Sequence, residues 1–201
     1  MSRTRRYNLL LSVVWGLWVL VAPAGAEVVS ESSYGGLLCG YGMSYPGWGE
    51  TTERVQVLDV IPRFCRVLDE KMGQDWYCLN RELWVETPIS LILSDTDSKD
   101  NHDVGVIGTS FLLALVSKAR SNIEPYLIAG GGPVYLLGDI KGVGSDLCGH
   151  YQAGGGVRFK VGCGQVFNLE VRYHHISNLD MASPNVPLNS TKVLLGTTWQ
   201  F

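Results

Sequence analysis

The most regular stretch of the sequence reads Val166-Phe167-Asn168-Leu169-Glu170-Val171-Arg172-Tyr173. Its odd positions are all apolar or aromatic, and its even positions are mostly polar or charged. Alternation with a period of two is typical of a β-strand whose two faces meet different surroundings. The same pattern returns, less strictly, in Leu83–Leu91 and in the final segment, Lys192–Phe201. We interpret it as the alternation of lipid-facing and interior-facing residues in a transmembrane barrel.

Glycine, proline, asparagine and aspartate divide the chain into about eight extended segments. Their approximate bounds are 34–45, 53–68, 80–94, 103–117, 123–138, 146–161, 165–177 and 190–201. A tilted strand needs about 10 residues to cross a bilayer, whereas strands of soluble proteins usually have about five or six. The segment lengths therefore predict an all-β fold, an eight-stranded antiparallel transmembrane β-barrel whose interior is filled by side chains. A soluble periplasmic lipid-binding β-barrel is the alternative.

The N-terminal segment has the three parts of an export signal. Three arginines precede the apolar run Leu9–Ala22, and the small residues Ala24–Ala26 follow it. This order predicts cleavage after Ala26, with residues 1–26 as a signal peptide and 27–201 as the barrel domain. The alternative is a retained anchor, but the run is shorter than the roughly 20 residues of a spanning helix.

The chain ends on an aromatic residue, Phe201, with Trp199 two positions before it. An aromatic residue at the end of an alternating strand is typical of the C-terminal strand of outer-membrane barrels, which the assembly machinery recognises. Together with the export signal, this ending predicts that the protein lies in the outer membrane of a Gram-negative cell.

Composition and charge exclude some classes of partner. The full chain has a net charge of −3 and loses three arginines with the signal segment, so the mature chain is acidic. That balance gives no reason to expect nucleic acid as a partner. The adjacent His174 and His175 point to opposite faces of a strand, and we expect neither a metal site nor a cofactor.

The cysteines lie at positions 39, 65, 78, 148 and 163. Two pairs, Cys65 with Cys78 and Cys148 with Cys163, are near enough in sequence to bridge hairpins in an oxidising compartment. Buried, inert thiols explain the same positions equally well, and the sequence leaves both readings open.

Candidate chemistry is concentrated in the segment His175-Ile176-Ser177-Asn178. On a strand, His175 and Ser177 share a face, and that face continues the apolar row that we assign to lipid. Placing polar side chains at the lipid boundary costs free energy, so a purely structural role is a poor explanation for them. For an enzyme that attacks an ester of a membrane lipid, however, a nucleophile and a base belong at this position.

This segment resembles the signature of the PagL family of lipid A 3-O-deacylases. The motif His175-x-Ser177-Asn178 is followed by Pro184-Asn185 and then by the last strand, over about 15 residues. The resemblance implies an eight-stranded outer-membrane barrel that hydrolyses an acyl ester of lipid A, the anchor of lipopolysaccharide, at position 3 and without a cofactor.

The resemblance also implies a role for each matching residue. Ser177 corresponds to the nucleophile and His175 to the general base of a serine esterase. Asn185 corresponds to the side chain that helps to stabilise the oxyanion, and Asn178 to the asparagine directly after the nucleophile. The backbone N–H of Asp180 corresponds to a second oxyanion donor, at a position that is glycine in the best-known members.

The sequence departs from the family where the acid of the catalytic triad belongs. Asn189 stands at the position of that glutamate, and Pro187 replaces a glycine. Asparagine can orient His175 by a hydrogen bond, but it cannot stabilise an imidazolium by charge. Asp180 and Glu170 are the alternative acids, although Glu170 has the opposite strand parity from His175.

The function therefore has two readings. The favoured one is a deacylase acting on lipopolysaccharide in the outer membrane, with Asn189 in the place of the triad acid. The alternative is a non-enzymatic barrel of the small adhesin or OmpX-like kind, with a degenerate motif. The sequence leaves open whether the protein forms a homodimer.

Overall fold

The computed structural model describes residues 33–72, 78–95, 105–117, 122–138, 140, 142–161 and 165–200. The expected signal peptide and Phe201 lie outside these residues. The described chain is all β. Its strands are β1 (Ser33–Ser44), β2 (Val55–Met72), β3 (Leu79–Glu86), β4 (Ile89–Asp95), β5 (Gly105–Gly108), β6 (Ser110–Ser117), β7 (Ile123–Leu136), β8 (Leu147–Val161), β9 (Gln165–Ser177) and β10 (Leu188–Gln200). No helix of the described part is long and apolar enough to span a membrane.

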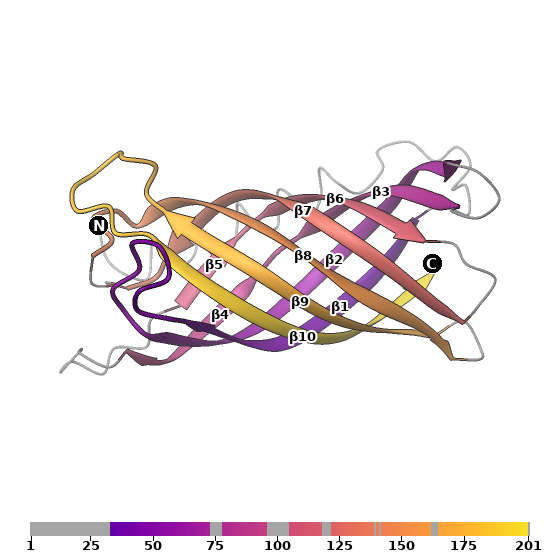
Figure 1. Ribbon diagram of the computed structural model, residues 1–201, viewed down its shortest axis with the longest axis horizontal. Coiled ribbons are helices and arrows are strands. Elements are labelled where there is room, and N and C mark those ends of the chain that lie inside the picture. The colour runs from indigo at the N-terminus through magenta and orange to yellow at the C-terminus, as the bar shows by residue number, and fades with distance from the viewer. Residues whose placement is uncertain are drawn as a thin grey trace, which may run out of the picture. The chain divides into compact units, whose positions relative to one another are not determined.

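The strands form one closed antiparallel barrel (Figure 1). Strand β1 pairs with both β2 and β10, which closes the sheet on itself. Strands β3 and β4 both pair with β2, and strands β5 and β6 both pair with β7. Each of these two pairs therefore acts as one interrupted strand, so the ten described segments make eight barrel strands. The predicted all-β barrel is confirmed.

Two of the predicted strands are interrupted, and prolines lie at both breaks. Pro88 separates β3 from β4, and it lacks the N–H that a continuous ladder needs. The break between β5 and β6 falls at Thr109, whose N–H donates to the carbonyl of Pro133 on β7 at 3.0 Å. The N–H of Gly108 donates to the carbonyl of Pro88 at 3.1 Å. Hydrogen bonds thus still join neighbouring strands across both breaks.

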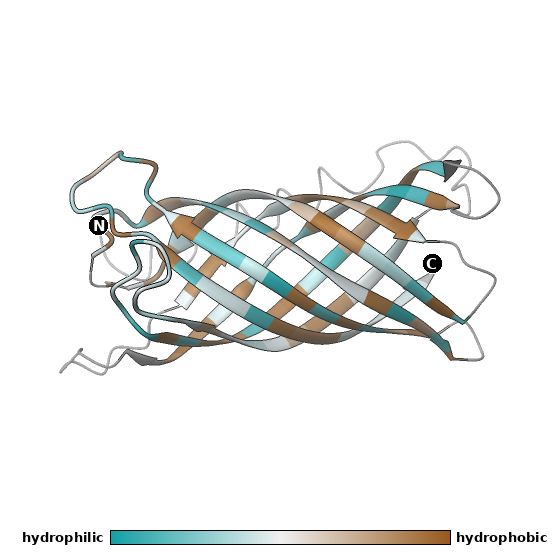
Figure 2. Cartoon of the chain, in the orientation of Figure 1, coloured by the Kyte–Doolittle hydropathy of each residue, from teal (hydrophilic) through white to brown (hydrophobic). Residues whose placement is uncertain are grey.

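The two faces of the wall differ sharply in chemistry. Figure 2 shows how hydrophilic and hydrophobic residues follow one another along the strands. In β9, Phe167, Leu169 and Val171 are exposed on the outside, while Glu170 and Arg172 are fully buried. The other strands carry similar exposed apolar side chains, among them Leu58, Val60, Leu91, Leu93, Leu113, Leu127, Val193 and Leu195. This belt suits the lipid-facing side of a membrane barrel.

Charged side chains that compensate one another fill the middle of the barrel. Arg63 contacts Glu86 at 2.7 Å and Glu170 at 2.6 Å, and Arg172 pairs with the same two carboxylates. All four side chains are fully buried. Buried charges are tolerated when they are paired in this way. Because side chains occupy this level of the interior, chemistry on a substrate belongs on the wall or in the loops.

The two ends of the barrel differ in the length of their connections. Tyr34 is paired with Gln200, so β1 begins and β10 ends at the same end of the barrel. The connections at that end span 73–78, 118–122 and 162–164, whereas those at the other end span 45–54, 96–104, 137–146 and 178–187. Outer-membrane barrels have short periplasmic turns and longer extracellular loops. Strand β9 therefore ends on the extracellular side (Figure 1).

The described cysteines are free thiols. Cys65 faces the buried interior, where it is paired in register with Trp84, while Cys78 precedes the start of β3. For Cys65 and Cys78 the structure therefore agrees with free thiols, one of the two readings that the sequence leaves open. Cys148 is also free, and Cys163 lies outside the described residues.

Candidate active site

The side chains of His175 and Ser177 lie on the outer face of the wall, where β9 ends. Both are partly exposed. The residue before His175, His174, and the residue between the pair, Ile176, are buried in the interior. The two outward side chains therefore share one face, as their spacing predicts. They continue the apolar row of β9 up to the extracellular end.

The imidazole of His175 is held from both neighbouring strands. Its register partners are Tyr151 of β8 and Asn189 of β10. The ring of Tyr151 stacks on it, with centroids 4.4 Å apart and planes 21° from parallel. Its Nδ1 lies 2.7 Å from Oδ1 of Asn189, which also accepts a hydrogen bond from the hydroxyl of Tyr173 at 2.5 Å. Among the described residues, Nε2 of His175 has no hydrogen-bond partner.

Ser177 lies two residues after His175 on the same face of the strand. Residues two apart on a strand are separated by about 6.6–6.8 Å, which side chains can span. Within the described part of the chain, no hydrogen bond joins Oγ of Ser177 to His175. A general base must come within about 2.6–3.2 Å of the proton it removes, and such contacts often tighten only with substrate bound.

The turn after Ser177 is closed by two asparagines. The backbone N–H of Asn178 donates to Oδ1 of Asn185 at 2.9 Å. The side chain of Asn178 is buried and donates to the carbonyls of Ala182 and Pro184 at 2.8 and 3.1 Å. Asn178 therefore serves as a structural clamp that shapes the turn.

Asp180 and Leu179 form the tip of the same turn in an unusual backbone conformation. Their φ angles are +59° and +56°, in the left-handed region that few residues other than glycine adopt. Their backbone N–H groups donate to no acceptor within the described residues. The carboxylate of Asp180 accepts a hydrogen bond from Nδ2 of Asn185 at 2.7 Å.

The loop between β1 and β2 reaches across to the same site. Nδ2 of Asn189 donates to the backbone carbonyl of Trp48 and to Oγ1 of Thr51, both at 2.9 Å. The ring of Trp48 packs against Tyr173, with centroids 5.1 Å apart. Asn189 therefore connects this distant loop to the imidazole of His175.

A family model described as lipid A 3-O-deacylase (PagL) matches residues 73–198, which is more than half of the chain. The chain belongs to the PagL family. The match includes every site residue that the sequence singles out, from His175 to Asn189.

Two solved structures share the fold of this PagL-family chain. The crystal structure of the outer membrane enzyme PagL superposes with a TM-score of 0.56 at 15% identity, covering 82% of this chain and 98% of that one. The crystal structure of Neisserial surface protein A gives 0.55 at 14% identity, covering 87% and 100%. No curated protein sequence matches the chain. The protein is an outer-membrane β-barrel, and the family match separates it from other barrels of this shape.

The three side chains considered for the place of the acid lie in different surroundings. Glu170 is buried in the interior and pairs with Arg63 and Arg172, on the opposite face of the strand from His175. Asp180 is engaged with Asn185. Asn189, at the position of the family glutamate, is the side chain that contacts Nδ1 of His175.

Four residues that surround His175 or Asn189 were not predicted from the sequence as part of the site. Tyr173 has the parity of His175 and could have been recognised, because the two share one face of the strand. Tyr151 could be identified only once the register between β8 and β9 was known, because that register pairs it with His175. Trp48 and Thr51 lie more than 130 positions from Asn189, and no local pattern connects them to it.

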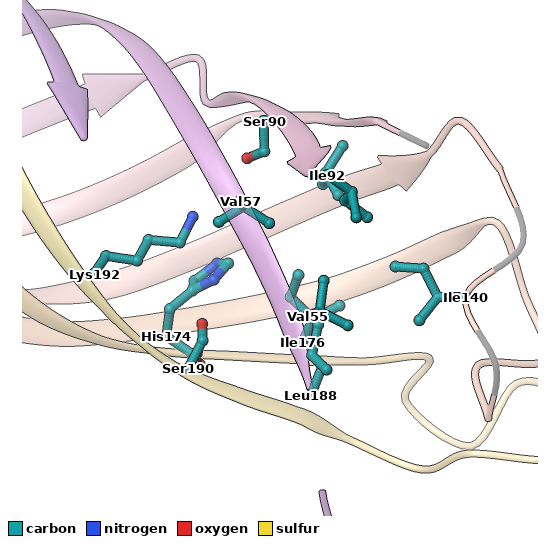
Figure 3. Close-up of a pocket in the computed structure, with 11 residues that line it drawn as sticks. Val55, Val57, Ser90, Ile92, Ile140, His174, Ile176, Leu188, Ser190 and Lys192 are labelled. Carbon is teal, nitrogen blue, oxygen red and sulfur yellow. Dashed lines mark hydrogen bonds between the residues drawn. The ribbon is translucent and has the colours of Figure 1, made fainter. Parts of the chain in front are cut away.

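A small cavity lies inside the barrel, on the other side of the wall from the PagL motif (Figure 3). Ser90, His174, Ser190 and Lys192 are its polar side chains, and the rest of its lining is aliphatic. The ammonium of Lys192 contacts Asp59 at 2.9 Å, and Nε2 of His174 lies 2.8 Å from Nδ1 of His150. These polar groups are already paired, and the described residues contain no cluster of three or more metal-ligating side chains. The cavity is therefore part of the packed interior.

Proposed function

We propose that this chain is a serine esterase that removes an acyl chain from lipid A by 3-O-deacylation of lipopolysaccharide. Family membership supports the substrate, and the outward position of His175 and Ser177 supports access from the membrane. The observation that carries the proposal is the contact between Nδ1 of His175 and Asn189, because it leaves Nε2 of the imidazole available as the catalytic base for Ser177.

In the proposed reaction, Nε2 of His175 takes the proton of the Ser177 hydroxyl as Oγ attacks the ester carbonyl carbon. The tetrahedral intermediate then collapses, and the carbon–oxygen bond to the sugar breaks. His175 returns the proton to the departing sugar oxygen. Water, deprotonated by the same imidazole, next attacks the acyl-enzyme, and the fatty acid leaves as Ser177 regains its proton.

The turn after Ser177 supplies donors for the oxyanion. The N–H groups of Leu179 and Asp180 follow Ser177 and Asn178 in this turn, and they donate to no acceptor within the described part of the chain. Such backbone donors stabilise developing negative charge, and loss of one oxyanion donor typically slows an enzyme about 10²–10³-fold. The amide of Asn185 is the side-chain donor, although one of its hydrogens is engaged by Asp180.

The position on the wall suits a lipid with several acyl chains. Val171 and Leu169 lie below the site on the same strand face and contact the hydrocarbon region. The loops beyond the site combine polar residues with exposed apolar side chains, among them Trp48, Leu179 and Met181. A lipid A molecule lying against β9 would thus present its sugar-linked esters at the level of Ser177.

Mass spectrometry of lipid A from cells that express the protein tests the proposal. The wild type is expected to yield lipid A that lacks one ester-linked acyl chain, and Ser177→Ala is expected to abolish that loss. Ser145→Ala, in the adjacent loop, is the matched control and should behave as the wild type. Unchanged lipid A in cells with folded wild-type protein in the outer membrane would instead support the non-enzymatic barrel.

A further inference from the structure

We propose that Thr51 and the carbonyl of Trp48 lock the amide of Asn189 in one orientation, which fixes the tautomer of His175. Asn189 can then orient the imidazole of His175, which is one of the roles of the acid that the triad lacks. Thr51 is a positioning residue in this scheme, since it acts on His175 only through Asn189. The inference rests on the proposed function for its catalytic consequence, but the tautomer itself can be measured without any turnover.

The first constraint comes from the backbone of the β1–β2 loop. A carbonyl oxygen can only accept a hydrogen bond, and that of Trp48 lies 2.9 Å from Nδ2 of Asn189. Rotating the amide by 180° would bring Oδ1 against the carbonyl oxygen, with no hydrogen between two acceptors. The amide nitrogen must therefore face the loop.

The second constraint comes from Thr51, whose single hydroxyl hydrogen is already used. Its Oγ1 donates to the carbonyl of Pro187 at 3.0 Å. The same oxygen accepts from both the backbone N–H and Nδ2 of Asn189, each at 2.9 Å. Thr51 is 2% exposed and Asn189 5% exposed, so little water competes for these bonds.

The orientation of the amide then determines where the proton of His175 sits. Oδ1 of Asn189 faces Nδ1 of His175 at 2.7 Å, and an amide oxygen can only accept. Nδ1 must therefore carry the hydrogen, and Nε2 keeps the lone pair that a general base needs. The hydroxyl of Tyr173 donates to the same oxygen.

This arrangement answers the main objection to asparagine at a triad position. In a serine protease, replacing the triad aspartate by asparagine lowers turnover about 10⁴-fold, partly because the histidine takes the wrong tautomer. Here two external acceptors prevent the amide from donating to the ring. The reduction in turnover that comes from the wrong tautomer is thereby avoided. Only the reduction that comes from the missing negative charge remains.

The test combines Thr51→Val with nitrogen NMR of the histidine rings. Protein labelled with ¹⁵N-histidine is folded in detergent micelles, and His175→Gln assigns the signal among the four histidines of the chain. In the wild type, Nδ1 of His175 is expected to be protonated and Nε2 unprotonated. Thr51→Val should produce a mixture of tautomers and lower the deacylation rate about tenfold, with little change in KM.

Two further variants serve as controls. Thr51→Ser keeps the hydroxyl and should restore the wild-type tautomer. Thr52→Val changes the neighbouring exposed threonine and should alter neither the spectrum nor the rate. If Thr51→Val does not fold, Asn189→Asp is the substitute. It sets a carboxylate oxygen against the Trp48 carbonyl and should lower the rate, whereas a site that merely lacks an acid would gain activity.

The outcomes separate the two proposals. A wild-type spectrum with Nε2 protonated, or a tautomer that Thr51→Val leaves unchanged, overturns the lock even if deacylation is observed. The expected tautomer in a folded barrel without deacylase activity supports the lock and overturns the proposed function. Higher activity of Asn189→Asp also counts against the lock.

Discussion

Asp180 combines an unfavourable backbone conformation with a competing hydrogen bond. Its φ of +59° belongs to the left-handed region, where the family pattern has glycine. Aspartate is among the residues that tolerate this region best, which explains how the turn persists without glycine. Its carboxylate, however, binds the Asn185 amide that the oxyanion would use.

Replacing Asp180 by glycine is therefore expected to raise the deacylation rate several-fold, because the amide of Asn185 becomes available to the oxyanion. Stability should change by less than about 1 kcal/mol, since relief of backbone strain offsets the greater freedom of glycine in the unfolded chain. Rates on purified lipopolysaccharide and urea unfolding measure the two effects. A slower Asp180→Gly enzyme would mean that the carboxylate assists the reaction.

The residues of the site could be predicted from the sequence in two ways. The parity of β9 places His175 and Ser177 on one face, and the resemblance to the PagL family points to Asn189. The contacts that orient Asn189 come from Trp48 and Thr51, on a loop at the other end of the sequence. Closure of the barrel brings that loop beside β10, and closure is not a local property.

At the scale of the strands, segment bounds were predicted within a few residues, but the two interruptions were not. The break at Thr109 depends on the register that places Pro133 on the adjacent strand, and the sequence does not specify that register. The glycines of β7 and β8 allow neighbouring backbones to approach closely: a Cβ on Gly131 would lie 2.1 Å from the carbonyl oxygen of His150.

Gly131→Ala is expected to destabilise the barrel by about 1–3 kcal/mol, because the added methyl group meets backbone that cannot move aside easily. Gly155→Ala is the control and should destabilise the barrel less. A Cβ on Gly155 would lie 2.9 Å from the nearest backbone atom, and its other close neighbour is the flexible side chain of Leu127. Urea unfolding in lipid vesicles measures both. Equal stabilities of the two variants would show that the wall relaxes around Gly131.

At the scale of the whole molecule, the paired charges in the middle of the barrel connect strands that are distant in sequence. Arg172 of β9 binds Glu86 of β3 at 2.7 Å and also pairs with Glu170, and neither carboxylate is exposed to solvent. Removing one partner from such a group leaves buried charge uncompensated, which typically costs about 3–5 kcal/mol.

Arg172→Leu should therefore strongly destabilise the folded barrel. Arg81→Leu breaks a surface pair with Asp69 in which both side chains are more than 40% exposed, and it should have little effect. Unfolding in urea, followed by tryptophan fluorescence, compares the two variants. Similar midpoints would mean that the interior charges contribute no more than the surface pair.

The outward position of His175 and Ser177 has a consequence for how the protein encounters its substrate. If the pair acts as proposed, a lipid substrate reaches it by travelling within the same leaflet. The frequency of encounter then follows the number of lipid A molecules per unit area of membrane, rather than their amount per volume of solution. Diluting lipid A with inert phospholipid or detergent slows such an enzyme, even when the total quantity of substrate is unchanged.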